Sequence, residues 1–271
     1  MNRRIWLWIE IAAGILFFVL LGFFVLRKVE DYRFVQRQRE LSASIQRVQV
    51  AEEPDSERLT KDLESSEIEL DSPGQDPEQK ARNRQKTRSE EARQQVERLR
   101  EAYPAVIAII EIPGTEVLFP VVQGQDNEYY LTHDKEGAYH PYGEVFLDYR
   151  NKPDFSEQHS IIYGHNIRSA KAIFNELMEY SDQAFYEAHP QINIYTTDGL
   201  KGYQIVSVFR ADPEEPYREI QWDSDAEYQE FTAHYFSQSI IQPKPYQPNS
   251  LLTISTCFDD EIRFVIMAVE K

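Results

Sequence analysis

The 271-residue sequence contains a single cysteine, Cys257. One cysteine cannot form a disulfide within its own chain, and it cannot supply the several thiolates of a structural zinc site. Basic residues are scarce as well: 29 Lys and Arg stand against 46 Asp and Glu, which gives a formal net charge of −17. A chain this acidic repels nucleic-acid phosphates, so we expect no nucleic acid among its partners.

Several signatures of cofactor and catalytic sites are also missing from the sequence. It has no glycine-rich phosphate loop, no convincing metal-ligand spacing, and no Gly-x-Ser-x-Gly elbow around Ser255. We therefore expect neither a cofactor nor a metal ion. The lone thiol of Cys257 becomes the first candidate for chemistry, because it has no partner in its own chain.

The N-terminal part carries an apolar run from Ile5 to Leu26, 22 residues with one charge, Glu10. At about 1.5 Å per residue it spans roughly 30 Å, the thickness of a bilayer core. Trp6 and Trp8 lie where an interfacial aromatic belt would be. A cleaved signal peptide is the alternative, but no small-residue cleavage site follows the run. The run predicts an uncleaved membrane anchor.

A strongly charged region follows the anchor. Residues 52–78 contain 11 acids and 2 bases, and residues 80–100 contain 8 bases and 3 acids. Such a composition cannot bury enough apolar surface to fold alone, so it predicts a solvated, partly helical stalk. A coiled coil or a partner-binding segment is the alternative. The helical spacing of Ala92, Val96 and Leu99 predicts a helix that ends before Pro104.

From Pro104 onward the composition is that of a β-rich domain. Eight strands are expected, over 106–112, 117–122, 144–148, 160–163, 192–196, 200–210, 251–257 and 262–269. Helices are expected over 127–131, 172–180 and 226–239. Eight short strands with few helices predict a mostly β, closed barrel. The predicted organisation is an N-terminal tip and anchor (1–29), a charged stalk (30–86), a helix (87–103) and a catalytic domain (104–271).

Cys257 ends the apolar segment 251–257, a position from which a strand can present a nucleophile. His165 is the favoured base, because it follows Gly164 at the end of another predicted strand. His133 and His140 lie in polar loops, and the three remaining histidines are expected at the surface or at strand edges: His159, His189 and His234. Arg263 begins the last strand and could stabilise an oxyanion, although a solvated edge charge is an equally good interpretation of it.

Three segments together resemble the signature segments of sortases, specifically of class B. They are Thr253–Cys257, Ile162–Asn166 and Arg263–Val265, and they are supported by Ile112–Thr115, Pro120–Gly124, Asn127–Leu131 and Phe146–Asn151. The resemblance covers about residues 100–271 in collinear order. It implies an eight-stranded sortase β-barrel and a membrane-anchored cysteine transpeptidase on the outer face of a Gram-positive cell.

The resemblance also implies roles for individual residues. Cys257 would be the nucleophile, His165 the proton donor and acceptor, and Arg263 the group that steadies the substrate carbonyl and its oxyanion. Ser255, Thr256 and Asn166 are expected to bind substrate. The substrate would be a surface protein or pilin with a C-terminal sorting signal similar to Leu-Pro-x-Thr-Gly or Asn-Pro-x-Thr. The acceptor would be an amine, from a peptidoglycan precursor or a pilin lysine.

Two alternatives to this function stay open: a catalytically silent, membrane-tethered binding or assembly module, and a cysteine hydrolase that cleaves the same signals. The sequence departs from the family in a short Cys257-to-Arg263 segment and in Ala108-Ile109, where a Trp is usual. Acidic residues in the region 211–250 could favour a basic flank on the substrate. Positive charges after the anchor favour a cytoplasmic location for the catalytic domain. The resemblance implies an extracellular location, and we follow the resemblance.

Overall fold

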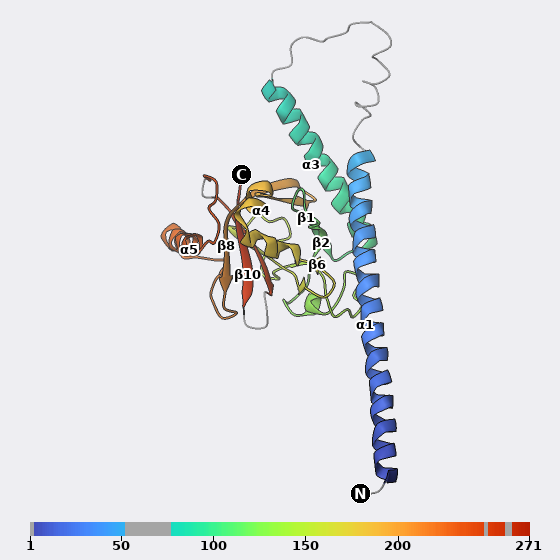
Figure 1. Ribbon diagram of the computed structural model, residues 1–271. Coiled ribbons are helices and arrows are strands. Elements are labelled where there is room, and N and C mark those ends of the chain that lie inside the picture. The colour runs from blue at the N-terminus through green and yellow to red at the C-terminus, as the bar shows by residue number, and fades with distance from the viewer. Residues whose placement is uncertain (1–2, 52–76, 247–248, 258–261) are drawn as a thin grey trace. The chain divides into compact units, whose positions relative to one another are not determined.

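The computed structural model describes residues 3–51, 77–246, 249–257 and 262–271 (Figure 1). The chain divides into two compact units, Met1–Ala43 and Ser44–Lys271, which are described separately.

The first unit is formed by most of helix α1 (Arg3–Ala51). The last turns of this helix, from Ser44 onward, belong to the second unit. Its stretch Glu10–Ile45 is long enough to cross a membrane and contains an 18-residue window with a mean hydropathy of 2.1. In the described part of the apolar run Ile5–Leu26 the large apolar side chains are exposed, Phe18 and Phe23 among them. An N-terminal signal sequence would have the same properties. Most of the acidic part of the expected stalk falls at 52–76, outside the described residues.

Helix α3 (Pro77–Ala102) begins ahead of the helix expected from residue 87. Proline is tolerated in the first turn of a helix, where its missing N–H would have no partner. The helix packs against β1, β7 and β8 of the barrel, and its Val96 is fully buried. Gln95 Nε2 also donates a hydrogen bond to the carbonyl oxygen of Ile45 at 2.8 Å. The C-terminal half of α3 is therefore part of the folded unit.

The second unit is built on a closed β-barrel, as the sequence predicted, with strands in the order β1-β2-β3-β4-β9-β10-β8-β7. The strands are β1 (Val106–Glu111), β2 (Leu118–Gln123), β3 (Phe146–Leu147), β4 (His159–Tyr163), β7 (Gln191–Thr196), β8 (Gly199–Ala211), β9 (Leu251–Cys257) and β10 (Arg263–Glu270). A small separate sheet pairs β5 (Asn166–Ile167) with β6 (Ala172–Ile173). The short helices are η1 (Tyr129–Leu131), η2 (Glu176–Ser181) and α4 (Gln183–Ala188).

Helix α5 (Asp225–Ser237) lies in the connection between β8 and β9 and packs on β8 (Figure 1). Ser224 caps it by accepting a hydrogen bond from Glu227 N at 3.3 Å, and Asp225 and Glu227 suit the positive end of the helix dipole. Its Tyr235 packs in the cluster that also holds Phe209 and Val265. This helix was expected over 226–239, in agreement with the structure to within two residues.

Two expected elements differ from the structure. The first half of the helix expected over 172–180 does not form. Lys171, just before this range, and Ile173 within it adopt positive φ values of 49° and 54°. These left-handed conformations break a helix, and Ile173 pairs instead with Asn166. The strand expected over 144–148 is reduced to β3, because Glu144 N bonds to the carbonyl of Tyr130 at 3.0 Å rather than to a strand.

The register around β9 fixes the geometry of one barrel edge. Strand β9 runs parallel to β4, with Tyr163 opposite Ser255, and antiparallel to β10, with Cys257 opposite Arg263. Residues 251–256 are all buried, which matches the continuous apolar and β-branched run of a strand covered on both faces. The carboxyl ends of β4 and β9 and the start of β10 therefore meet at the same edge.

Candidate active site

The three candidate catalytic residues come together at this edge. Cys257 is the last residue of β9 and Arg263 the first of β10, and the two are directly paired in the sheet. His165 lies two residues after Tyr163, just as Cys257 lies two residues after Ser255. Residues far apart in the sequence thus reach one site because their strands are neighbours in matching register. The side chain of Cys257 lies outside what the structure describes.

Gly164 sets the path of the chain into His165. A Cβ at this position would lie 2.6 Å from a ring carbon of Phe174, which is closer than real Cβ atoms approach. The main chain is held on both sides, since Gly164 N donates to Ser255 O at 3.3 Å and Phe174 N donates to His165 O at 3.1 Å. Glycine is therefore required here by a close approach of the Phe174 ring.

The ring of His165 has one protein partner in the described contacts. Its Nε2 lies 2.9 Å from the carbonyl oxygen of Leu131, at the end of η1. Because a carbonyl can only accept, Nε2 carries a proton in this contact. The Leu131 carbonyl thereby orients the imidazole and selects the tautomer in which Nε2 carries the proton.

A cavity of about 260 Å³ opens at this edge and is lined by His165 and Arg263. The other described lining residues are Asn127, Leu131, Phe146, Tyr163, Gly164, Tyr217, Arg218, Ser255 and Thr256. Ser255 and Thr256, two of the three residues expected to bind substrate, are therefore part of the cavity lining. Asn166 does not line the cavity, and its Oδ1 instead accepts a hydrogen bond from Asn175 Nδ2 at 2.7 Å.

Two residues of the cavity wall, Tyr217 and Arg218, were not identified from the sequence. Tyr217 is buried and its hydroxyl lies 2.9 Å from Ser255 Oγ, while the Arg218 guanidinium lies over its ring at 5.5 Å. They belong to the connection between β8 and α5, where a possible role was predicted from the sequence only for the acidic residues. No periodicity marks an irregular segment, so its lining residues had no sequence signal.

A fully buried carboxylate, Asp148, supports the floor of the cavity. It accepts hydrogen bonds from Arg150 Nε at 2.9 Å and Nη2 at 2.8 Å, from the Tyr163 hydroxyl at 2.9 Å, and from Asn127 Nδ2 at 2.9 Å. Burial by itself would raise the pKa of Asp148, but the hydrogen bonds from Arg150 and Tyr163 hold it below the usual value. Burial and the nearby Asp148 carboxylate raise the pKa of Tyr163, which therefore stays a neutral donor.

His159 is placed differently from the surface or edge position expected for it. It is fully buried, with Nδ1 2.5 Å from the carbonyl oxygen of Glu219 and Nε2 2.7 Å from Thr253 Oγ1. Burial lowers its pKa to about 4, so the ring is neutral near pH 7. The expectation was wrong because the polar neighbours of His159 in the sequence gave no sign that its partners lie on β9 and in a distant loop.

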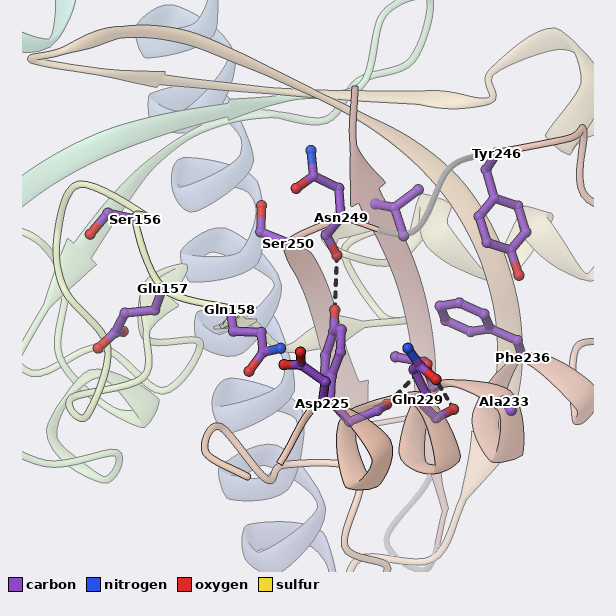
Figure 2. A pocket seen from close by; sticks show the side chains of 13 residues that line it. Ser156, Glu157, Gln158, Asp225, Gln229, Ala233, Phe236, Tyr246, Asn249 and Ser250 are labelled. Carbon is purple, nitrogen blue, oxygen red and sulfur yellow. Dashed lines mark hydrogen bonds between the residues drawn. The ribbon is translucent and has the colours of Figure 1, made fainter. Parts of the chain in front are cut away.

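A larger cavity of about 580 Å³ lies beside α5 (Figure 2). Its lining includes Asp225, Phe236, Tyr246 and Asn249. It lies at the N-terminal end of β9, where Asn249 precedes the strand, whereas Cys257 ends the strand. The candidate catalytic residues are therefore remote from it along β9.

Comparison with known proteins identifies the family of this chain. The sortase domain model matches residues 110–271. Sortase B of Staphylococcus aureus is 29% identical over 172 residues, covering 63% of this chain and 70% of that protein. Sortase B of Listeria monocytogenes is 29% identical over 171 residues, covering 62% of this chain and 68% of that protein.

The solved structures agree with these sequence relatives. The S. aureus sortase B–substrate complex superposes with a TM-score of 0.63 at 27% identity, covering 71% of this chain and 90% of that one. Sortase B of Clostridium perfringens gives a TM-score of 0.61 at 25% identity, covering 65% of this chain and 98% of that one. The chain therefore belongs to the sortase family of cysteine transpeptidases, which act on sorting signals, and its relatives are of class B.

Proposed function

We propose that Cys257, His165 and Arg263 form the catalytic centre, with the roles of nucleophile, proton carrier and oxyanion stabiliser. The observation that carries the proposal is the register of three strands, which pairs Cys257 with Arg263 and brings the end of β4, with His165, to the same edge. A guanidinium beside a thiol favours the thiolate, the nucleophilic form, and it keeps its charge throughout the reaction.

In the proposed reaction, the Cys257 thiolate attacks the carbonyl carbon of the threonine in a sorting signal. Arg263 stabilises the negative charge that develops on the carbonyl oxygen. The C–N bond then breaks, and His165 gives a proton to the leaving amine, which leaves a thioester on Cys257. An incoming amine attacks the thioester, transfers a proton to His165 and releases the thiolate with a new amide bond.

Three residues are proposed to bind the signal peptide. Ser255 and Thr256 line the cavity, and Thr256 Oγ1 is buried without a hydrogen-bond partner among the described protein atoms. A peptide carbonyl or amide in the cavity would supply that partner. Asn166 follows His165 in the chain, and its Nδ2 is likewise buried without a hydrogen-bond partner among the described protein atoms. Asn166 would thus contribute only for a substrate that extends past the lining residues.

The partners are proposed to be surface proteins or pilins that carry a signal similar to Leu-Pro-x-Thr-Gly or Asn-Pro-x-Thr. The acceptor is proposed to be an amine of a peptidoglycan precursor or of a pilin lysine. Sortases are associated with the cell surface. We propose that α1 anchors this chain by a single pass, with the short N-terminal tip in the cytoplasm and residues 104–271 outside. The apolar stretch Glu10–Ile45 supports the anchor.

A thiol probe tests the catalytic centre directly. A thiosulfonate or vinyl sulfone should label the wild-type chain, fail to label Cys257→Ala and label His165→Ala more slowly. A reactive wild type argues against a silent binding module, and an unreactive one would refute the proposed enzyme. Mass spectrometry of products from signal peptides, with and without an added amine, separates transfer from hydrolysis. Ligation products that form only with the amine support the transpeptidase, whereas free acid alone supports the hydrolase.

A further inference from the structure

The segment 212–224 connects β8 to α5 and forms one wall of the cavity through Tyr217 and Arg218. All of it is described, and none of it is strand or helix. Its own main chain makes only local turns, such as the bond from Glu219 N to Pro216 O at 3.2 Å. An irregular segment of this kind needs contacts from elsewhere to keep one conformation.

Two side chains from outside the segment, Arg150 in the loop after β3 and His159 at the start of β4, bind consecutive carbonyl oxygens of it. Arg150 Nη2 donates to the carbonyl of Arg218 at 2.9 Å, and His159 Nδ1 lies 2.5 Å from the carbonyl of Glu219. Because the Glu219 carbonyl can only accept, Nδ1 carries the proton. In the neutral ring Nε2 is then the acceptor, and it accepts from the Thr253 hydroxyl at 2.7 Å. His159 therefore links the segment to β9 in one defined tautomer.

Both donors are held rigidly. Arg150 is fixed by its two hydrogen bonds to the buried Asp148 carboxylate. The His159 ring is fully buried and lies next to Phe231 of α5, with ring centroids 5.8 Å apart, and its other ring neighbour, Trp222 at 5.9 Å, belongs to the segment itself. Side chains that are already ordered lose little entropy when they bind a partner, so they constrain the carbonyls that they hold.

We infer that His159 and Arg150 are positioning residues for peptide binding, which hold the carbonyls of Arg218 and Glu219 and so keep Tyr217 and Arg218 in the cavity wall. The inference rests on the proposed catalytic centre at this cavity. Neither His159 nor Arg150 lines the cavity itself. When the hydrogen bonds to these two carbonyls are lost, the cavity wall that contacts the sorting signal is displaced. The affinity for the peptide then falls, while the Cys257 thiol remains reactive.

Two substitutions of His159 separate this role from a general loss of structure. In His159→Asn the amide nitrogen takes the place of Nδ1 and can still donate to the Glu219 carbonyl. In His159→Gln the amide nitrogen takes the place of Nε2, so the Glu219 carbonyl loses its donor. Both variants lose the imidazole ring, so the loss of the ring cannot explain a difference between them. Tyr228→Phe is the matched control, because it removes a hydrogen bond to the Asn249 carbonyl at 2.8 Å and keeps its ring.

Kinetics would use the full chain in detergent and fluorogenic peptides carrying Asn-Pro-x-Thr or Leu-Pro-x-Thr-Gly. We expect His159→Gln to raise KM by about tenfold, the effect of one lost hydrogen bond, with kcat changed by less than about twofold. His159→Asn should restore most of the wild-type KM, and Tyr228→Phe should leave KM unchanged. A lower kcat at constant KM, or equal KM values for the Asn and Gln variants, would overturn the inference.

Amide hydrogen exchange tests the contact between His159 and the Glu219 carbonyl independently of catalysis. Exchange across residues 212–224 should accelerate in His159→Gln but not in His159→Asn or Tyr228→Phe. Unchanged exchange in His159→Gln would refute the positioning role even if activity fell. Thiosulfonate labelling of Cys257 should proceed at the wild-type rate in all three variants. Absence of labelling in the wild type would refute the proposed function instead, and the exchange result would still decide whether His159 holds the segment.

Discussion

Tyr163 on β4 and Ser255 on β9 face each other in a parallel pair, and each stands two residues before a candidate catalytic residue. His165 and Cys257 therefore leave the barrel at the same level. On the other side of β9, Cys257 is paired directly with Arg263. The position of the site at this barrel edge follows from backbone register, and the side chains that surround it refine the arrangement.

Replacement of Arg263 tests the proposed oxyanion contact. We expect Arg263→Gln to lower kcat by about 10²- to 10³-fold, the usual cost of removing one stabiliser of a developing oxyanion. Arg263→Lys keeps the charge but loses the planar fork, and it should recover only part of the rate. Single-turnover kinetics with a sorting-signal peptide measure this. If Arg263→Gln retained wild-type kcat, Arg263 would be only an edge charge.

Gly164→Ala should disturb the site through packing. The new Cβ would lie 2.6 Å from the Phe174 ring, so the chain entering His165 must shift, at a cost of about 1–3 kcal/mol in unfolding free energy. Urea denaturation and peptide cleavage should both report the change, and Phe174→Leu should partly rescue it. Gly202→Ala is the matched control, because no atom lies within 4 Å of its Cβ position. Equal effects at the two glycines would contradict the Phe174 contact.

The buried His159 predicts a pH dependence of stability. Its folded-state pKa of about 4 lies below its unfolded value of 6.5, so the folded protein resists protonation. Above pH 6.5 the ring is neutral in both states and the stability is complete. As the pH falls from 6.5 to 4 only the unfolded chain takes up the proton, which removes roughly 3 kcal/mol.

Urea denaturation between pH 7 and pH 4 measures this loss. Arg150, Asp148 and the Glu219 carbonyl all act on the His159 ring, and their effects are contained in its lowered pKa. Carboxylates elsewhere titrate in wild type and variant alike, so the informative quantity is the difference between the wild type and His159→Gln. A difference that stays constant over this range would contradict a buried neutral imidazole.

Asp148 should be more important for stability than any single partner it binds. Asp148→Asn leaves the partly exposed Arg150 without its counter-charge, and we expect a loss of about 2–3 kcal/mol in unfolding free energy. Tyr163→Phe removes one neutral donor from the same carboxylate and should cost about 1–2 kcal/mol. A double-mutant cycle between the two positions measures their coupling. Additive losses would indicate that the 2.9 Å contact between them contributes nothing.

Local features of this protein could be predicted from its residues alone. The apolar run that starts at Val106 and the apolar and β-branched run Leu251–Cys257 predicted strands, because a strand buried on both faces has such a composition. The lone Cys257, together with His165 and Arg263 at strand ends, marked the candidate site. Each of these signals depends on residues that are close together in the chain.

The tertiary structure decided which distant segments meet. The contact of Tyr217 with Ser255 and that of His159 with the Glu219 carbonyl join residues 38 and 60 positions apart, and Asp148 binds Tyr163 and Asn127 across 15 and 21 positions. Left-handed backbone at Ile173 overrode an apolar helical pattern, and Ile173 pairs with Asn166 in a small sheet instead. Contacts of this kind leave no periodic trace in the sequence, since they arise only when the barrel closes and brings its loops together.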